Sequence, residues 1–256
     1  MFQAFDLTGK VALITGGNGG IGLGMAEGLA QAGADIAIWG TNAGKNEAAL
    51  EKILAHGRRA IALTCDVGDE AAVTAAFAET LAKLGRVDGC FANAGVSGAG
   101  ATGFADMPTS EWHRVLRVNL DGAFFTLRAG AAHMVARGGG GVLVGTSSMG
   151  ALYGGVRSEH YTASKAALIA ITNGLAVELA RHQIRAHSIL PGWIETDMTT
   201  RLTTNDKFAT NVLPRIPMRR WGNGTDFAGI AVYLMSDASQ WHTGGSFLID
   251  GGYGLF

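Results

Sequence analysis

The amino-acid sequence predicts an α/β protein in which helices cover both faces of one parallel sheet. Short apolar runs alternate with longer segments rich in Ala and Leu from one end of the chain to the other. This alternation is typical of a doubly wound sheet. A glycine-rich turn joins the first apolar run to the first helical segment. The chain has 256 residues, enough for one large core, and we expect a single domain over residues 1–256.

Four apolar runs in the first half of the chain predict strands, because each is short and bounded by turn residues. The predicted strands cover 11–14, 35–39, 60–64 and 87–91, and the helical segments between them cover 23–32, 46–56 and 70–83. Gly33 follows the first helical segment and marks its end, since glycine readily adopts the left-handed conformation found at helix C-termini. Each strand is thus followed by a helix, as in a parallel sheet.

The second half of the chain continues this alternation. A long helix is expected to begin at Thr109 as its N-cap, with Glu111 in its first turn, and to run past Asn119 to about residue 136. Further strands are predicted at 141–146, 184–190 and 246–249, and further helices at 162–177 and 225–235. Residues 193–220 contain two prolines and are expected to form an irregular substrate loop. Seven strands in this arrangement predict a doubly wound Rossmann fold.

The composition argues against nucleic acid and membrane partners. The net charge is −1, so the chain has no basic excess that would attract nucleic acid or an anionic lipid surface. Charged residues make up 16% of the chain, against roughly 25% in typical soluble proteins, while hydrophobic residues make up 48%. This balance leaves apolar surface to be covered, so we expect contacts between subunits.

The N-terminus and the cysteines indicate the compartment. Residues 1–6 lack the basic and apolar segments of a signal peptide, and no apolar run is long enough to span a bilayer. Cys65 and Cys90 show neither metal-ligand spacing nor a disulfide framework, so we expect reduced core thiols and no metal. Together these features predict a cytoplasmic protein.

Tyr161 and Lys165 are four residues apart in a segment that predicts a helix, so their side chains share one face. A free tyrosine has a pKa of about 10, and a neighbouring ammonium group stabilises the phenolate and lowers that pKa. Ser147 and Ser148 end the preceding apolar run. A serine delivered there can hold a substrate oxygen while Tyr161 moves its proton. Alone, this spacing is also that of an ordinary surface pair, so other motifs must support it.

The turn after the first strand is Thr15-Gly-Gly-Asn-Gly-Gly-Ile-Gly22. Gly16, Gly20 and Gly22 allow backbone N–H groups to approach a phosphate, and the helix N-terminus that follows favours an anion. At the first strand–helix junction of a doubly wound sheet, this pattern predicts a dinucleotide site. The spacing Thr-Gly-x-x-x-Gly-x-Gly differs from the commoner Gly-x-Gly-x-x-Gly fingerprint.

Over essentially its whole length the sequence resembles the classical short-chain dehydrogenases/reductases. The matching motifs occur in the order and at the spacings of that family. They are Thr15-Gly-Gly-Asn-Gly-Gly-Ile-Gly22, Cys65-Asp66-Val67, Asn93-Ala94-Gly95, Val118-Asn119-Leu120, Ser147-Ser148, Tyr161-Thr-Ala-Ser-Lys165, Pro191-Gly192-Trp-Ile-Glu-Thr196 and Asp250-Gly251-Gly252. The resemblance implies an NAD(P)-dependent oxidoreductase that transfers hydride between nicotinamide and a secondary alcohol or ketone.

The resemblance also implies a catalytic tetrad of Asn119, Ser148, Tyr161 and Lys165. Tyr161 would be the general acid in reduction and the base in oxidation, and Lys165 would lower its pKa and bind the nicotinamide ribose. Ser148 would hold the substrate oxygen, and Asn119 would hold a water of a proton relay in a disturbed helix turn. Asn119 can instead cap a break in the helix. Ser147 competes with Ser148, but the family's spacing of thirteen residues before the tyrosine favours Ser148.

A second set of residues would line a cofactor cleft. The resemblance implies that Asp66 and Val67 bracket the adenine, although Asp66 can also be a helix cap. Ile194 and Thr196 would contact the nicotinamide carboxamide and the phosphates. The full expected set is Gly16, Asn18, Gly20, Ile21, Gly22, Thr41, Asn42, Asp66, Val67, Asn93, Ala94, Gly95, Tyr161, Lys165, Pro191, Gly192, Ile194 and Thr196.

The end of the second strand bears on the choice between NAD and NADP. An Asp there binds the adenosine ribose and repels a 2′-phosphate. The corresponding residue is Gly40, followed by Thr41 and Asn42, with Lys45 close in sequence. These groups can donate hydrogen bonds to a 2′-phosphate, which favours NADP slightly. The family's usual basic residues are absent, because position 19 is Gly and position 41 is Thr, so NAD and dual use stay open.

The substrate is the least defined part of the prediction. Ser148, Met149, Tyr153, Trp193 and Met198 are expected to line a substrate pocket of largely apolar character, although such residues also simply pack a loop. Alternatives to a general alcohol or ketone substrate are a 3-oxoacyl-carrier-protein reductase-like enzyme and a glucose- or gluconate-type sugar dehydrogenase. A catalytically silent cofactor-binding scaffold is a further alternative, against which the intact tetrad argues. The resemblance implies a homotetramer with the apolar residues 253–256 in an interface.

Overall fold

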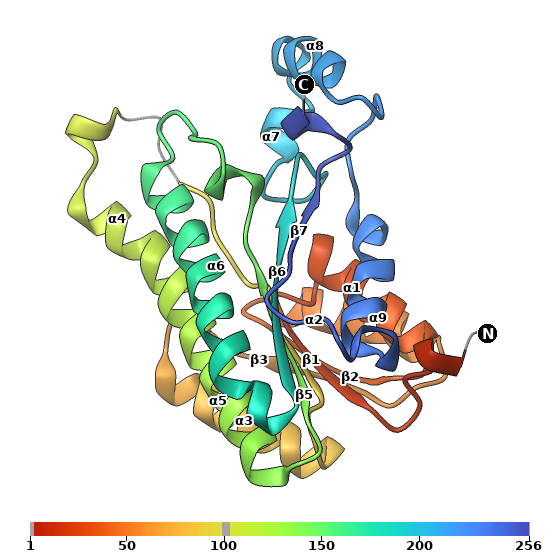
Figure 1. Ribbon diagram of the computed structural model, residues 1–256. Coiled ribbons are helices and arrows are strands. Elements are labelled where there is room, and N and C mark those ends of the chain that lie inside the picture. The colour runs from red at the N-terminus through yellow and green to blue at the C-terminus, as the bar shows by residue number, and fades with distance from the viewer. Residues whose placement is uncertain (1–2, 99–102, 256) are drawn as a thin grey trace.

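The computed structural model describes residues 3–98 and 103–255 and contains the predicted parallel sheet (Figure 1). Its strands are β1 (Val11–Thr15), β2 (Asp35–Gly40), β3 (Ala60–Thr64), β4 (Gly89–Ala92), β5 (Gly141–Thr146), β6 (Ile184–Pro191) and β7 (Ser246–Ile249). They form one seven-stranded sheet in the order β3-β2-β1-β4-β5-β6-β7, and every neighbouring pair is parallel. The predicted fold class is therefore confirmed.

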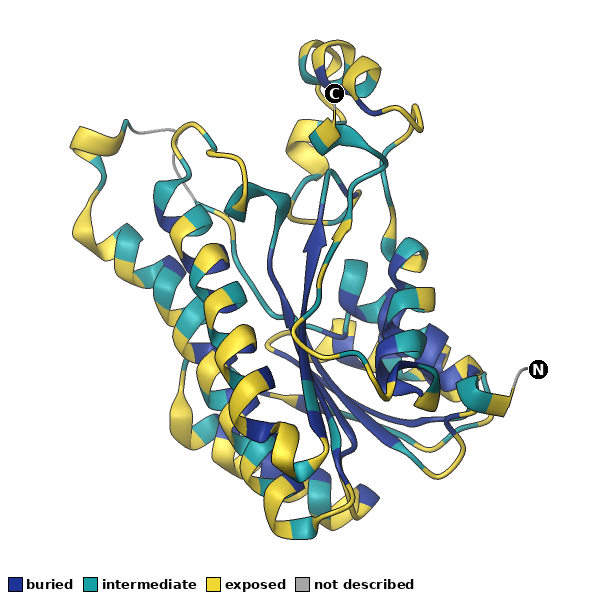
Figure 2. Ribbon diagram, in the orientation of Figure 1, coloured by how far each residue is buried: buried dark blue, intermediate teal, exposed yellow. Residues whose placement is uncertain are grey.

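Helices cover both faces of this sheet (Figure 1). One face carries α1 (Gly20–Gln31), α2 (Ala43–Leu54) and α9 (Ala228–Met235), and the other carries α3 (Glu70–Leu84), α4 (Thr109–Leu116), α5 (Gly122–Arg137) and α6 (Glu159–Leu179). Successive strand residues point to opposite faces, so Leu13 and Ile14 of β1 belong to different core clusters. Both are fully buried, and the strands lie in the buried centre of the molecule (Figure 2).

The strand order places the chain reversal between β1 and β4. From β1 the chain continues to β2 and β3 on one side, and from β4 it continues to β5, β6 and β7 on the other. In open parallel sheets, ligands bind at the carboxyl ends of the strands beside such a reversal. The glycine-rich turn follows β1, and residues 93–95 follow β4, so these two motifs lie at this crevice.

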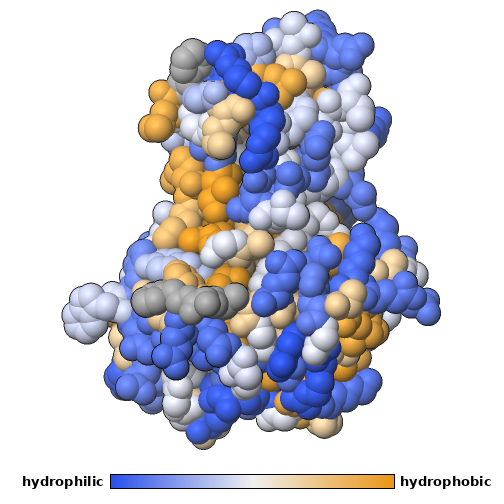
Figure 3. All heavy atoms as spheres, turned by 90° about the vertical axis from the view of Figure 1, so that its right-hand side faces the viewer, coloured by the Kyte–Doolittle hydropathy of each residue, from blue (hydrophilic) through white to orange (hydrophobic). Residues whose placement is uncertain are grey.

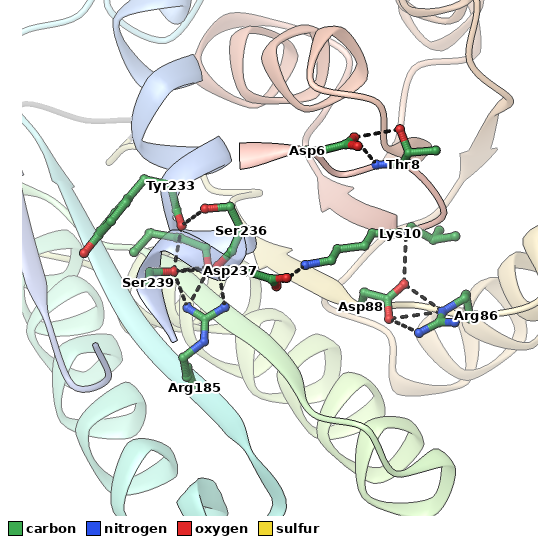
Figure 4. A network of polar contacts seen from close by, with 12 residues as sticks. Asp6, Thr8, Lys10, Arg86, Asp88, Arg185, Tyr233, Ser236, Asp237 and Ser239 are labelled. Carbon is green, nitrogen blue, oxygen red and sulfur yellow. Dashed lines mark hydrogen bonds and ion pairs between the residues drawn. The ribbon is translucent and has the colours of Figure 1, made fainter. Parts of the chain in front are cut away.

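A polar network lies at the amino ends of the strands, on the opposite side of the sheet from the crevice (Figure 4). Lys10, just before β1, forms an ion pair of 2.7 Å with Asp237, which lies beyond α9. Asp88 accepts a hydrogen bond of 2.9 Å from the Val11 amide and pairs with Arg86 at 2.6 Å. These contacts join the starts of β1 and β4 to the end of α9, away from the crevice.

The long helix expected from Thr109 is interrupted. Residues Arg117–Asp121 form a π-helical turn between α4 and α5, so Asn119 lies in a disturbed turn, as the resemblance implied. The N-cap position belongs to Pro108 rather than Thr109. Proline fits there because it fixes the backbone dihedral φ and needs no donor in the first turn.

The segment 193–220 is more ordered than expected. It contains the short helices α7 (Thr200–Thr203) and α8 (Asp206–Val212), which lie beyond the carboxyl end of β6 (Figure 1). The Asn205 side chain caps α8 by accepting a hydrogen bond of 2.9 Å from the Phe208 amide. The expectation of an irregular segment is therefore wrong in part, because both helices are too short to give a clear apolar period.

Within the described residues, one helical stretch, Glu159–His182, is long and apolar enough to cross a bilayer, with a mean hydropathy of 1.3. The sequence analysis found no unbroken apolar run of that length, because polar residues such as Lys165 interrupt it. In the fold, this stretch packs against β5 and β6 and buries Leu168 and Lys165. It therefore packs one face against the sheet, and length and composition alone are weak evidence for a membrane span.

Candidate active site

A cleft of about 340 Å³ opens at the carboxyl ends of β1, β4, β5 and β6. Most of the residues predicted from the sequence meet there. The predicted residues that line it are Gly16, Asn18, Gly20, Ile21, Asn93, Ala94, Gly95, Ser148, Tyr161, Lys165, Pro191, Gly192, Ile194, Thr196 and Met198. A larger hollow of about 500 Å³ lies between α3 and α5, and none of the predicted site residues lines it.

The glycine-rich turn has the shape that a phosphate requires. Gly16 and Gly20 adopt φ of 64° and 50°, a left-handed conformation that favours glycine. A side chain at Gly22 would place its Cβ 2.2 Å from the Gly16 carbonyl oxygen. The turn therefore needs glycine at these positions, and its bare backbone leads directly into the N-terminus of α1. The residues present fit the pyrophosphate of a dinucleotide.

Thr15 joins this turn to the segment that follows β4. Its Oγ1 accepts hydrogen bonds of 3.0 Å from the Asn93 and Ala94 amides, and the Asn93 side chain donates to the Thr15 carbonyl at 3.0 Å. These bonds fix both walls of the cleft at the point where the strand order reverses.

Lys165 lies at the floor of the cleft with its ammonium group removed from water. Its Nζ donates a hydrogen bond of 2.8 Å to the Thr146 carbonyl at the end of β5 and lies 5.7 Å from the centre of the Tyr161 ring. Burial lowers the lysine pKa to about 8, because water no longer solvates the charged form. The ammonium group is thus buried within reach of the phenol.

The pKa of Tyr161 differs from the expectation. Burial raises the pKa of the phenol above its usual value, and a hydrogen bond with Ser148 acts in the lowering direction. The sequence analysis expected Lys165 to lower this pKa. In the structure, desolvation outweighs the hydrogen bond with Ser148, and Lys165 is not among the causes that shift this pKa.

The two serines after β5 have different partners. Ser147 is buried, and its hydroxyl donates a hydrogen bond of 2.7 Å to the Lys165 carbonyl in α6. Ser148 instead contacts the Tyr161 phenol, and its hydroxyl accepts a hydrogen bond of 3.1 Å from the Gly150 amide. Only Ser148 therefore has its hydroxyl beside the phenol, while Ser147 fastens the strand to the helix.

Asn119 lies directly behind the cleft wall. Its Oδ1 accepts a hydrogen bond of 2.8 Å from the Val96 amide, and its Nδ2 donates to the Val96 carbonyl at 3.0 Å. A Cβ added at Gly95 would lie 3.3 Å from both Asn119 Oδ1 and Lys165 Nζ. The π-helical turn thus brings this side chain close to the lysine and lets it hold the segment after β4.

The adenosine end of the cleft is built around asparagines. The Asn18 side chain donates a hydrogen bond of 2.7 Å to Asn46, which in turn donates to the Gly40 carbonyl at 3.0 Å. A Cβ at Gly40 would lie 2.2 Å from Asn18 Nδ2, so an aspartate there would displace this network. Asn42 caps α2 by accepting a hydrogen bond of 2.9 Å from the Lys45 amide.

Sequence analysis missed Asn46, although its place in the first turn of a helix after the second strand was a usable signal. The residues that line the cleft and were missed are Gly19, Thr146, Asp197 and Thr199. Each is a direct neighbour of a residue that the sequence analysis named. Ser147, weighed there as the alternative to Ser148, also lines the cleft.

Asp66 and its neighbours lie outside the lining of the cleft. The carboxylate of Asp66 accepts hydrogen bonds from the Gly68 amide at 3.0 Å and from Arg117 at 2.9 Å. The other predicted residues outside the lining are Gly22, Thr41, Asn42, Val67, Asn119, Met149, Tyr153 and Trp193.

Two aromatic residues expected at the substrate pocket have other contacts. Trp193 packs against Phe208 of α8 and Tyr253, with ring centres 5.0 and 6.4 Å apart. The Tyr153 hydroxyl donates to the Gly254 carbonyl at 3.2 Å. Both side chains therefore tie α8 and the C-terminal segment to the rest of the fold. Hydrophobic side chains gather at the narrow waist of the molecule, below the upper part that contains α8 (Figures 1 and 3).

Comparisons with known proteins agree with this architecture. The chain matches the family model described as Enoyl-(Acyl carrier protein) reductase over residues 16–254. It is 37% identical over 254 residues to 2-dehydro-3-deoxy-D-gluconate 5-dehydrogenase of Escherichia coli (strain K12), covering 99% of this chain and 98% of that protein. It is 38% identical over 247 residues to L-rhamnose 1-dehydrogenase (NAD(P)(+)) of Sphingomonas sp. (strain SKA58), covering 96% of each.

Solved structures give the same result. A gluconate 5-dehydrogenase from Burkholderia cenocepacia J2315, in complex with NADP and tartrate, superposes with a TM-score of 0.92 at 34% identity. The match covers 99% of this chain and 98% of that one.

Proposed function

The chain belongs to the short-chain dehydrogenase/reductase family and is an NAD(P)-dependent oxidoreductase, and from this premise we propose that Tyr161 exchanges the proton with a secondary alcohol or ketone. The observation that carries the proposal is the contact of the Tyr161 phenol with Ser148, beside the buried ammonium of Lys165. In carbonyl reduction the phenol donates its proton to the substrate oxygen, and in alcohol oxidation the phenolate removes it.

Ser148 and Lys165 have separate tasks in this proposal. The Ser148 hydroxyl holds the substrate oxygen and stabilises the negative charge that develops on it. Lys165 supplies a positive charge that attracts the phenolate as it forms. Little solvent screens this attraction, because the ammonium group is buried. Its bond to the Thr146 carbonyl keeps Nζ in position.

Asn119 acts in this proposal through the cleft wall and the lysine. Its two hydrogen bonds with Val96 fix the segment after β4, and its oxygen lies close to Lys165 Nζ across Gly95. We assign it the proton-relay role that the family resemblance implies.

A bound nicotinamide cofactor supplies or accepts the hydride. The glycine-rich turn and residues Asn93, Gly95, Ile194 and Thr196 would hold it along the cleft. We propose NADP as the preferred cofactor, because the position that would carry a selective aspartate is Gly40 and a side chain there would displace Asn18. Thr41 and the N-terminus of α2 would then face the 2′-phosphate.

The proposed substrate is a secondary alcohol or ketone of a sugar or sugar acid. The relatives named above carry gluconate and rhamnose in their names, which favours this class over a 3-oxoacyl thioester. We further propose a cytoplasmic homotetramer. The buried, unpaired thiols of Cys65 and Cys90 support a reducing compartment.

The experiment is a substrate screen of the purified protein with NAD, NADH, NADP and NADPH. The panel contains gluconate, keto-gluconates, rhamnose, simple secondary alcohols and a 3-oxoacyl thioester, and nicotinamide absorbance reports turnover. We expect turnover on a hydroxylated acid or sugar, with a higher kcat/KM for the phosphorylated cofactor. Turnover on the thioester alone would contradict the proposed sugar or sugar-acid substrate. A preference of more than about tenfold for NADH, worth 1.4 kcal/mol, would contradict the assignment of NADP.

A further inference from the structure

An ion pair spans the mouth of the cofactor cleft. Lys45, in the first turn of α2, contacts the carboxylate of Asp197, which follows β6 and lines the cleft. The two residues are 152 positions apart in the chain, and their N···O distance is 2.5 Å. Their side chains are 54% and 82% exposed, respectively. The contact therefore joins the adenosine side of the cleft to the segment on its nicotinamide side.

Lys45 is the only charged residue in positions 40–46, which span the end of β2 and the first turn of α2. Two neighbouring polar side chains already have partners inside the protein: Asn42 caps the helix, and Asn46 bonds to Gly40, Leu63 and Asn18. By contrast, the only bond that the described residues show for the Lys45 ammonium group is the one to Asp197. That carboxylate is itself exposed to solvent. Lys45 is thus the cation that a ligand at this end of the cleft can recruit most easily.

We propose that Lys45 recognises the 2′-phosphate of NADP and that Asp197 competes with this phosphate for the ammonium group. The inference rests on the proposed function, because it assumes that the cleft binds a nicotinamide dinucleotide. In the free protein Lys45 pairs with Asp197. When the phosphorylated cofactor binds, Lys45 pairs with the 2′-phosphate and releases Asp197 together with the segment after β6.

Charge explains the direction of this exchange. An exposed ion pair contributes only about 0.2–1 kcal/mol, because water screens both charges. A phosphate monoester carries about −1.5 to −2 charges at neutral pH and offers three acceptor oxygens, whereas Asp197 carries one negative charge. The phosphate therefore wins the ammonium group, aided by the N-terminus of α2. NAD lacks this phosphate and leaves the ion pair closed.

Three single variants and one double variant separate the two partners. Lys45→Met removes the cation, and we expect it to weaken binding of 2′,5′-ADP at least tenfold while changing the affinity for 5′-ADP less than twofold. Lys45→Arg keeps the charge and is expected to retain the preference. Asp197→Asn removes the competitor and is expected to tighten binding of 2′,5′-ADP about two- to fivefold. This gain disappears when Lys45→Met is added.

Matched controls on the same elements test whether loss of charge alone explains the result. Lys52→Met changes an exposed lysine in the last turn of α2, and Glu195→Gln changes an exposed carboxylate two residues before Asp197. Both should leave the affinities for the two nucleotides within twofold of the wild type. Calorimetric titration of the full chain with each nucleotide measures these affinities without any turnover.

The outcomes distinguish the inference from the function on which it rests. Equal weakening of both nucleotides by Lys45→Met, or no weakening of either, would overturn the role of Lys45 in a protein that still turns over substrate. A wild type that binds 5′-ADP but discriminates against 2′,5′-ADP would overturn it too. Failure of the wild type to bind NAD, NADP or either ADP would overturn both the inference and the proposed function.

Discussion

Lys165 is the residue on which the proposed chemistry of the cleft depends, and its burial also destabilises the fold. Its charge is buried, and it contacts a neutral carbonyl and the face of an aromatic ring. A buried ammonium group without a carboxylate partner is destabilising. Stability is thus sacrificed where the proposed proton transfer needs a positive charge.

The variant Lys165→Met should therefore stabilise the protein without cofactor while it abolishes activity. Lowering the lysine pKa from 10.5 to about 8 corresponds to a cost of about 3 kcal/mol for the folded state below pH 8. The cost declines between pH 8 and 10.5, where the folded lysine is neutral and the unfolded lysine is still charged. Thermal unfolding should show the variant to be more stable by roughly 1–3 kcal/mol at pH 7, and this gap should fall to below about 1 kcal/mol at pH 10. A less stable variant at pH 7 would contradict the account.

The two serines provide a second test at this scale. Ser148→Ala should lower kcat at least about a hundredfold, because it removes a donor to the developing oxyanion. Ser147→Ala should change kcat far less, and its main effect should be a loss of about 1 kcal/mol of stability from the bond to the Lys165 carbonyl. Steady-state kinetics and thermal unfolding of both variants measure the split. The reverse order of kinetic effects would show that the wrong serine was assigned.

At the scale of elements, close approach between α1 and the segment before α9 positions the glycine-rich turn. A Cβ at Gly24 would lie 2.0 Å from the Gly224 carbonyl oxygen, and a Cβ at Gly28 would lie 2.5 Å from the Cβ of Ala228, the first residue of α9. Helix α1 can therefore lie directly against this segment, and its N-terminus stays aimed at the cleft.

Gly24→Ala should destabilise the protein by about 1–3 kcal/mol, because the added methyl group meets backbone that cannot move aside. Gly229→Ala in α9 is the matched control, since a Cβ there has no neighbour within 4 Å. It should be neutral or stabilise by up to about 1 kcal/mol through helix propensity. Chemical denaturation of both variants measures the difference. Equal effects would mean that the close approach does not limit the fold.

The central strands β1, β2, β4, β5 and β6 were predictable because burial on both faces leaves continuous apolar runs. The predicted ranges 60–64, 141–146 and 246–249 coincide with β3, β5 and β7. The short helices α7 and α8 and the π-helical turn at Asn119 were not predictable from periodicity. A helix of one or two turns has no clear apolar period, and a π turn depends on the packing of the neighbouring segments.

For the whole molecule, exposed apolar surface supports the proposed tetramer. Trp241 and Val177 are 102% and 84% exposed, and β7 is one of the two edge strands of the sheet. An exposed edge strand and fully exposed large side chains are unusual in a monomer. Light scattering at micromolar concentration should give about four times the monomer mass, and Val177→Asp should reduce it. A monomeric wild type would contradict the proposal.

Motifs located the candidate cleft from the sequence because several of them directly follow a strand of the parallel sheet. Ser148 could be separated from Ser147 by spacing, and the structure adds the physical reason in the partners of the two hydroxyls. The contact of Lys45 with Asp197 could not be predicted, since it depends on how the segment after β6 folds back over the cleft. Nor could the raised pKa of Tyr161, which depends on burial by elements distant in sequence.

The most direct test of the account is the turnover of Tyr161→Phe on the substrate that the screen identifies. The substitution removes the proton carrier and leaves the ring, so the cleft and the cofactor contacts should persist. We predict a fall in kcat of at least about a thousandfold, with the Kd for the nicotinamide cofactor within a few-fold of the wild type. A variant that binds cofactor and keeps more than about a tenth of the wild-type kcat would contradict the assignment of Tyr161 as general acid and base.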